Sequence, residues 1–535
     1  MGLKQRIVDR GKQALLQPSV LRWVTDDRVM KATEGLMDAR TRVKDAWKVL
    51  LNGNELPNVD PALDENIGQT EPALGKSNGH SNGHANGSAN GASNGSSATV
   101  NGSSANARVD MSDREGSTDM AESMKERTSL ASVGGKDVFE KAFKFMAADN
   151  ARKMGIYPYF RPLDFADGPE AQINGKRVVM FGSNNYLGLT THPKVRDAAK
   201  AAIDKYGTSM TGSRLVNGSM RLHEEFEEKL AKWFNKESAL VFTTGYQVNI
   251  ATLAALLSNK QSVAFIDRNV HASLYDGVRL GQSAGARLVR YRHNDAESLD
   301  KALEKLEAEE GAFVITDGVF SAEGEIAKLD ELVPVVKKHK ARLFVDDAHA
   351  LGVIGPGGMG TAAHFGLMDQ VDLIGGTFSK SMASIGGWLV GERKVLDYIR
   401  HFAPSFMFAA AAAPPSVAAA MAAFDVMQEE PWRIDKLREN FTYMREGLKS
   451  LGFELGHTQT AVIPIYIRQD LRTIMMWRDL LEEHGIYTNP FISPGVPPKS
   501  AMLRTSYMAT HERHHLDRAL EAFEKVGKKY GVIGK

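Results

Sequence analysis

The strongest signal in this sequence comes from Leu343-Phe344-Val345-Asp346-Asp347-Ala348-His349 and, further along, Val371-Asp372-Leu373-Ile374-Gly375-Gly376-Thr377-Phe378-Ser379-Lys380. In both stretches a short apolar run ends in a polar motif. Short apolar runs that end in this way are typical of buried strands. The two stretches therefore predict strand ends that bring Asp346 and Lys380 together.

Similar apolar runs precede this pair and alternate with helix-length intervals. They occupy residues 239–242, 263–266, 287–291 and 312–316. The alternation predicts an α/β fold with a large, mostly parallel sheet between helices. Because ligands bind beyond the carboxyl ends of such strands, we expect Ser321, Asp346 and Lys380 to converge at one edge.

The chemistry of this pair suits pyridoxal phosphate (PLP). A lysine amine condenses with the PLP aldehyde, and a carboxylate keeps the pyridine nitrogen protonated so that the ring accepts electrons. Lys380 is placed for the first role and Asp346 for the second. The segment Thr244-Gly245-Tyr246 opens a helical stretch whose amides favour a phosphate, and Thr377 and Ser379 add hydroxyl donors. An ordinary tight turn would explain Gly245 alone.

Four further residues are candidates for the same site. His271 can stack on the pyridine ring and meet a substrate carboxylate, although a polar loop residue is the commoner interpretation. His349 and Ser321 can approach the phenolic oxygen of the cofactor. The planar guanidinium of Arg504 suits an amino-acid carboxylate, with a surface salt bridge as the alternative.

Composition limits the class of protein. The 535 residues are too many for one compact core, and the net charge of +1 gives no reason to expect a nucleic-acid partner. The absence of cysteine excludes disulfides and thiolate chemistry. The chain contains no apolar stretch that reaches the roughly 20 residues of a membrane span. We expect a cytoplasmic enzyme without a metal, because His511, His514 and His515 have no supporting ligand nearby.

The sequence divides into five predicted parts. Residues 1–70 are a helical N-terminal extension and residues 71–136 a flexible, low-complexity linker rich in Asn, Gly and Ser. Residues 137–180 lead into the catalytic unit, which comprises a large PLP-binding domain at 181–415 and a smaller C-terminal α/β domain at 416–535.

The extension is basic and amphipathic. Residues 1–52 carry eleven Lys and Arg against six Asp and Glu, a net charge of +5. Such a helix can lie on the anionic inner face of a membrane. A small helical hairpin that packs on itself or on a partner is the alternative.

Several motifs, in their order along the chain, resemble the α-oxoamine synthases, which are PLP enzymes of fold type I. These motifs are Ser183-Asn184-Asn185-Tyr186-Leu187-Gly188, Gly212-Ser213-Arg214-Leu215-Val216-Asn217-Gly218, Asp346-Asp347-Ala348-His349 and Gly376-Thr377-Phe378-Ser379-Lys380. Within the family, Tyr157-Pro158-Tyr159-Phe160-Arg161 and Ser506-Tyr507-Met508-Ala509-Thr510-His511 are most similar to bacterial serine palmitoyltransferases. The resemblance covers the chain from about Phe139 onwards.

The resemblance implies a role for each candidate residue. Lys380 binds PLP and removes the α-proton of the amino acid, Asp346 pairs with the pyridinium, and His271 stacks on the ring and contacts the substrate carboxylate. Asn185 lies near the substrate, and Arg504 holds its carboxylate. The remaining candidates contact the phenolic oxygen or the phosphate: His349, Ser321, Gly245, Tyr246, Thr377 and Ser379.

The resemblance also implies a reaction, the decarboxylating condensation of L-serine with a long-chain acyl thioester to 3-ketodihydrosphingosine in a homodimer. Two alternatives remain: a sister synthase that uses glycine or alanine, or acyl-carrier protein in place of coenzyme A, and a PLP aminotransferase. The residues Ala409, Ala410 and Ala411 stand where relatives often place Ser or Thr near the partner subunit's phosphate. The sequence therefore leaves undecided whether this stretch contacts the cofactor phosphate of the partner subunit.

Overall fold

The structure, a computed structural model, describes residues 137–534. The predicted extension at 1–70, its membrane contact and the linker at 71–136 lie outside these residues. Within the described range, no helix is both long enough and apolar enough to cross a membrane.

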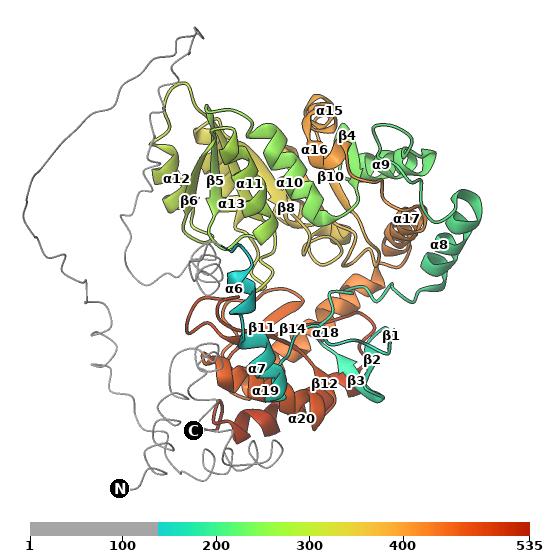
Figure 1. The fold of residues 1–535 in the computed structure, drawn as a ribbon, viewed down its shortest axis with the longest axis vertical. Coiled ribbons are helices and arrows are strands. Elements are labelled where there is room, and N and C mark those ends of the chain that lie inside the picture. The colour runs from blue at the N-terminus through green and yellow to red at the C-terminus, as the bar shows by residue number, and fades with distance from the viewer. Residues whose placement is uncertain (1–136, 535) are drawn as a thin grey trace, which may run out of the picture. The chain divides into compact units, whose positions relative to one another are not determined.

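A seven-stranded sheet dominates the described chain, with helices α10, α11 and α13 beside its strands (Figure 1). The strand order is β4-β10-β9-β8-β7-β5-β6. Its strands are β4 (Ser238–Phe242), β5 (Ser262–Asp267), β6 (Arg287–Tyr291), β7 (Gly311–Asp317), β8 (Arg342–Asp346), β9 (Leu373–Thr377) and β10 (Gly387–Gly391). The strands β6, β5, β7, β8 and β9 pair in parallel. The predicted α/β fold with a mostly parallel sheet is confirmed.

The strand β10 is the element of this sheet that the apolar runs did not predict. It lies between β4 and β9 and is antiparallel to both. Its five residues begin and end in glycine, so the apolar run is only Trp388-Leu389-Val390. Because β10 runs in the opposite direction, its first residue lies at the edge where the parallel strands end, with Gly387 opposite Thr377.

Helices connect the strands and cover the sheet. Those up to residue 429 are α6 (Glu140–Phe143), α7 (Ala147–Lys153), α8 (Pro193–Tyr206), α9 (Arg221–Trp233), α10 (Gly245–Leu256), α11 (Ala272–Ser283), α12 (Ala296–Leu303), α13 (Leu329–Lys338), α14 (Thr361–His364), α15 (Arg393–Phe402), α16 (Pro404–Met407) and α17 (Pro414–Glu429), with 3₁₀ turns η2 (Pro356–Gly358) and η3 (Met368–Gln370). The helix α10 is apolar along most of its length and packs against β9, β10 and α11.

Two smaller sheets complete the fold. One joins β11 (Val462–Tyr466), β14 (Met502–Ser506) and β13 (Asn489–Phe491), and the other joins β1 (Phe165–Asp167), β2 (Glu170–Ile173), β3 (Lys176–Met180) and β12 (Ile486–Tyr487). The C-terminal helices are α18 (Trp432–Ser450), α19 (Asp470–Glu482) and α20 (Arg513–Lys529). Because β3 pairs with β12, the segment before residue 181 is part of a sheet with the C-terminal region. The domain boundaries at 180 and 415 remain predictions.

Glycines allow the start of α10 to approach the sheet closely. A Cβ atom on Gly387 would lie 2.5 Å from Cγ2 of Val248 and 2.8 Å from the carbonyl oxygen of Thr244. A Cβ atom on Gly245 would lie 2.6 Å from Cβ of Thr377. Any larger residue at either position would push the helix start away from the end of β9.

We predict that Gly387→Ala destabilises the protein, because the added methyl group has no space against α10. The free energy of unfolding should fall by about 1–3 kcal/mol, measured as a shift in the denaturation midpoint. Gly311→Ala is the matched control at the start of β7, since a Cβ atom there has no neighbour within 4 Å. It should change the free energy by less than about 0.5 kcal/mol. Equal effects of the two substitutions would contradict the packing argument.

Candidate active site

A cavity of about 320 Å³ lies at the carboxyl edge of the seven-stranded sheet. Eight of the eleven predicted site residues line it. The lining consists of Thr244, Gly245, Tyr246, Asn249, His271, Ser273, Asp317, Val319, Asp346, Ala348, His349, Gly376, Thr377, Ser379, Lys380, Ile385 and Gly386. These residues lie at or beyond the carboxyl ends of β4, β5, β7, β8 and β9 or just before β10, as expected where parallel strands end together.

Lys380 follows β9 on a turn anchored by a buried aromatic ring. Phe378 is 1% exposed and stacks on Phe226, with ring centroids 4.9 Å apart. Burial lowers the pKa of Lys380 to about 8, although the nearby carboxylate of Asp346 opposes the shift. Arg504 lowers the pKa further. Near neutral pH a far larger fraction of this amine is therefore unprotonated than in an ordinary lysine, as a nucleophile or base requires.

Asp346 is the last residue of β8 and is held by two donors. Its Oδ2 accepts a hydrogen bond of 2.6 Å from Nδ2 of Asn249, and its Oδ1 accepts one of 3.0 Å from the amide of Ala348. These bonds fix the direction of the carboxylate within the cavity. Its charge is therefore available to a cation placed there.

His271 precedes α11 and is oriented by its neighbours. Its amide donates to Oδ2 of Asp317 at 3.1 Å, and its Nδ1 lies 2.7 Å from Oγ of Ser273. The residue keeps contact with solvent at the cavity, yet the surrounding protein removes enough water to lower the pKa of the ring, which Asp346 partly offsets. The imidazole is therefore neutral near pH 7, and Nε2 is the nitrogen available to a ligand.

The start of α10 has the features of an anion site. The first amides of a helix have no intrahelical acceptor. Oγ1 of Thr244 accepts from the amide of Gln247 at 3.1 Å and caps the helix. Oγ1 of Thr377 lies 2.8 Å from Oγ of Ser379, so two hydroxyl groups stand near the same point. Tyr246 donates its hydroxyl to Asp276, and burial together with this bond raises its pKa to about 12.

His349 contacts a residue for which the sequence suggested no role. The hydroxyl of Tyr186 lies 2.7 Å from Nδ1 of His349. Burial and the positive charges of Lys380 and Arg504 hold the pKa of His349 well below its usual range. The imidazole is therefore neutral and can act as a hydrogen-bond partner.

Three predicted residues lie outside the cavity lining formed by the described chain. Nε of Arg504 donates to the carbonyl oxygen of Ser321 at 2.6 Å, and its Nη2 donates to Oδ1 of Asn184 at 3.1 Å. Nδ2 of Asn185 donates a hydrogen bond to Oγ1 of Thr190 at 2.9 Å. Arg504 is 4% exposed, so the surface salt bridge is not its role. The predicted contacts of Asn185, Ser321 and Arg504 with ligands remain predictions.

Known proteins resemble this chain over its described part. A model of the family "Aminotransferase class I and II" matches residues 176–523. The chain is 42% identical over 390 residues to the serine palmitoyltransferase of Sphingobacterium spiritivorum, covering 73% of this chain and 96% of that protein. It is 39% identical over 386 residues to the 8-amino-7-oxononanoate synthase of Thermoanaerobacter pseudethanolicus, covering 72% and 96%. The chain belongs to the α-oxoamine synthase family.

A solved structure of serine palmitoyltransferase from S. paucimobilis, with bound PLP–myriocin aldimine, superimposes on this α-oxoamine synthase with a TM-score of 0.71. The two chains are 34% identical, and the match covers 74% of this chain and 100% of the other. The family resemblance predicted from the motifs is therefore confirmed.

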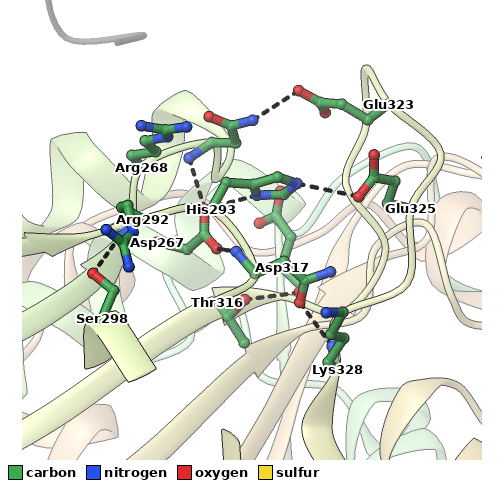
Figure 2. A network of polar contacts seen from close by, with 12 residues as sticks. Asp267, Arg268, Arg292, His293, Ser298, Thr316, Asp317, Glu323, Glu325 and Lys328 are labelled. Atoms are coloured by element: carbon green, nitrogen blue, oxygen red, sulfur yellow. Dashed lines mark hydrogen bonds and ion pairs between the residues drawn. The ribbon is translucent and has the colours of Figure 1, made fainter. Parts of the chain in front are cut away.

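The loop that carries His271 in this α-oxoamine synthase is held by a second polar network (Figure 2). At its centre is Asp267, the last residue of β5, which is fully buried. Its Oδ1 accepts from the amide of Asn269 at 2.8 Å, and its Oδ2 accepts from the amide of Asn294 at 2.6 Å. These bonds tie the segment before His271 to the loop after β6.

The network includes a protonated histidine. Nδ1 of His293 lies 3.1 Å from Oδ1 of Asp267, and its Nε2 lies 3.6 Å from Oε2 of Glu325 (Figure 2). Burial alone would lower the pKa of His293, but its hydrogen bond to Asp267 and its ion pair with Glu325 raise it to about 10. The imidazolium thus neutralises two acidic groups close to the site.

Sequence reasoning missed four residues that complete the site: Asn249, Ser273, Asp317 and Tyr186. Asn249 could have been found as a polar residue among the mostly apolar positions of α10, four positions after Gly245. Asp317 ends a strand as Asp346 does. Tyr186 stands inside a quoted motif and Ser273 lies two residues after His271, but Tyr186 pairs with His349 and Ser273 with Asn249, so local sequence alone did not indicate a role.

We predict that Lys380 reacts with an amine-selective reagent half-maximally near pH 8, whereas an ordinary lysine would do so near pH ~10.4. Peptide-resolved mass spectrometry of the cofactor-free protein across pH measures this reactivity. In Asp346→Asn the midpoint should fall further, because the attraction of the carboxylate is lost. Reactivity at Lys380 that keeps rising to pH 10 would contradict the assignment.

We predict that His293→Gln destabilises the protein by about 3–5 kcal/mol at pH 6, because the buried carboxylate of Asp267 and the partly buried carboxylate of Glu325 lose their cation. The folded-state pKa of about 10 lies above the ordinary 6.5. The stabilisation is therefore complete below pH 6.5 and disappears as the pH rises towards 10. Urea denaturation at several pH values should show the difference from wild type narrowing over this range. The exposed His401→Gln is the control, and a difference independent of pH would refute the ion-pair role.

Proposed function

We propose that this α-oxoamine synthase condenses L-serine with a long-chain acyl thioester, with loss of carbon dioxide, to 3-ketodihydrosphingosine, the first step of sphingolipid synthesis. The observation that carries the proposal is the cavity itself, in which Lys380, Asp346 and His271 converge. The similarity to serine palmitoyltransferases along almost their whole length supports the same conclusion.

The cavity residues fit PLP. The amine of Lys380 has a lowered pKa, the carboxylate of Asp346 is held by two donors, and α10 begins at Gly245 with amides and nearby hydroxyl groups that suit a phosphate. When bound, PLP supplies an electron sink for the amino acid. Lys380 would hold its aldehyde carbon, Asp346 its pyridine nitrogen, and the start of α10 with Thr377 its phosphate.

The protein residues divide the remaining work. Lys380 Nζ, unprotonated in part near neutral pH, accepts the α-proton of serine and later returns a proton to the same carbon. Between these steps the α-carbon bonds to the acyl carbon, the thiol leaves, and the serine carboxylate departs as carbon dioxide. His271 is neutral and offers Nε2 to that carboxylate, and the Asp346 carboxylate stabilises positive charge on the ring side of the cavity.

A sister synthase is the second candidate. The chain is only slightly less similar to an 8-amino-7-oxononanoate synthase than to serine palmitoyltransferases. Glycine or alanine as the amino acid, or an acyl-carrier-protein thioester as the donor, would distinguish it. An aminotransferase would instead regenerate its cofactor with a keto acid and release no carbon dioxide.

The proposal extends to assembly and location. Large apolar side chains are exposed on the described chain: Ile385, which lines the cavity, is 61% exposed, and Val216 and Phe408 are each 74% exposed. Such side chains are typical of surfaces that a second subunit covers, so a homodimer is part of the proposal. Acyl-CoA as donor, a cytoplasmic location and a membrane contact through the N-terminal basic helix belong to the proposal as well.

We predict that the PLP-loaded protein releases a long-chain keto-amine from serine and an acyl thioester. Product mass spectrometry with serine, glycine and alanine, each combined with acyl-CoA and acyl-carrier protein, identifies both substrates. Lys380→Ala should lower the rate by about 10³-fold or more, because it removes the proton carrier. Lys394→Ala, at an exposed position on α15, is the control and should retain activity. Turnover with glycine or alanine but not serine would refute the serine assignment.

A further inference from the structure

A chain of hydrogen bonds joins His271 to Asp346 beneath the cavity. Nδ1 of His271 lies 2.7 Å from Oγ of Ser273, which accepts from Nδ2 of Asn249 at 2.7 Å. The same Nδ2 donates to Oδ2 of Asp346 at 2.6 Å. The two linking side chains are almost fully buried, with Asn249 2% and Ser273 1% exposed. Two residues at different strand ends are thus connected through one side chain of α10 and one of α11.

The partners settle which way the amide of Asn249 points. The carboxylate of Asp346 can only accept hydrogen bonds, so it must face the amide nitrogen and not the amide oxygen. Oδ1 of Asn249 then has no hydrogen-bond partner among the described residues. An unpaired buried oxygen is unfavourable. The arrangement therefore gives Asp346 and Ser273 a hydrogen-bond donor, whereas the amide oxygen of Asn249 receives none.

The same reasoning settles the protonation of His271. Because Oγ of Ser273 already accepts from Asn249, its own proton is available to Nδ1 of His271. The amide of Ser273 also points at Nδ1, at 3.3 Å, and an amide can only donate. A proton on Nδ1 would face both donors. The neutral ring must therefore carry its proton on Nε2, the nitrogen that the cavity leaves for a ligand.

We propose that Asn249 and Ser273 are positioning residues, which together fix the carboxylate of Asp346 and hold His271 in the Nε2-protonated tautomer that donates to the substrate carboxylate. The proposal deepens the proposed function and rests on it. It assigns Asn249 a double role, since one amide nitrogen orients both the carboxylate of Asp346 and, through Ser273, the imidazole of His271.

If Asn249 had a purely structural role, replacing another buried polar residue of α10 should have the same effect as replacing Asn249. Thr252 is the matched case, because it is fully buried on the same helix, its Oγ1 has no partner among the described residues, and it is absent from the cavity lining. Thr252→Val keeps the shape of the side chain and removes the hydroxyl. It tests the effect of altering a buried polar group on α10 without touching the chain of bonds.

The direct test is nuclear magnetic resonance of ¹⁵N-histidine in the full-length, PLP-loaded protein, with His271→Gln to assign the signal. Wild type and Thr252→Val should show an unprotonated Nδ1 and a protonated Nε2 at His271. Ser273→Ala should give a mixture of tautomers, and Ser273→Thr, which keeps the hydroxyl, should restore the single form. An unchanged tautomer in folded Ser273→Ala would overturn the proposal.

Ligand affinity provides the second readout. Serine binding, followed by visible absorbance without any thioester, should weaken about tenfold or more in Ser273→Ala and in Asn249→Ala, as expected for a lost charge-assisted hydrogen bond. Asn249→Ala should also weaken PLP binding, whereas Thr252→Val should change both affinities less than twofold. Unchanged serine and PLP affinities in Asn249→Ala would overturn the proposal even if Ser273→Ala failed to fold. The tautomer can be read without turnover, so failure of wild type to make a keto-amine would refute the proposed function and leave this inference separately tested.

Discussion

The site depends on the attraction between the carboxylate of Asp346 and the amine of Lys380 in a cavity where the surrounding protein removes part of the water around them. Burial alone disfavours the charged form of each group. The carboxylate offsets part of this effect on the lysine, whose pKa of about 8 reflects both influences. A stronger attraction would keep the amine protonated, and a weaker one would leave the carboxylate without a compensating charge. The neighbouring residues hold Asp346 and Lys380 at a separation where the attraction is between these two extremes.

The neighbouring residues act through two separate polar networks. One consists of Asn249 and Ser273, which orient Asp346 and His271 from below the cavity. The other is centred on Asp267 and His293 and holds the loop that leads to His271. Each network has a buried centre, Asn249 and Ser273 in one and Asp267 in the other, so the loss of a hydrogen-bond partner there is costly. Rigid support of this kind keeps catalytic groups aligned without reorganisation during the reaction.

Much of the site could be predicted from the sequence, because its residues stand at strand ends in one sheet. Apolar runs identified six of the seven strands, and the polar residue or glycine after each run identified eight of the lining residues. The strand β10 was not predicted, because its apolar part is only three residues long and lies between glycines. The structure places the guanidinium of Arg504 against Ser321 and Asn184, and its contact with the substrate carboxylate stays a prediction. Pairing across more than 180 residues of chain cannot be read from local pattern.

The sequence by itself determined the fold class, the family and the residues able to carry PLP chemistry, because strand periodicity and motif order are local properties of the chain. Only the tertiary structure decided how those residues are held. The amide of Asn249 meets Asp346 because α10 packs against β9 and β10, and Gly245 and Gly387 leave space for that approach. The tautomer of His271 and the protonation of His293 follow from partners on other strands. Hydrogen-bond direction and pKa depend on three-dimensional surroundings, and these exist only once the distant segments have packed together.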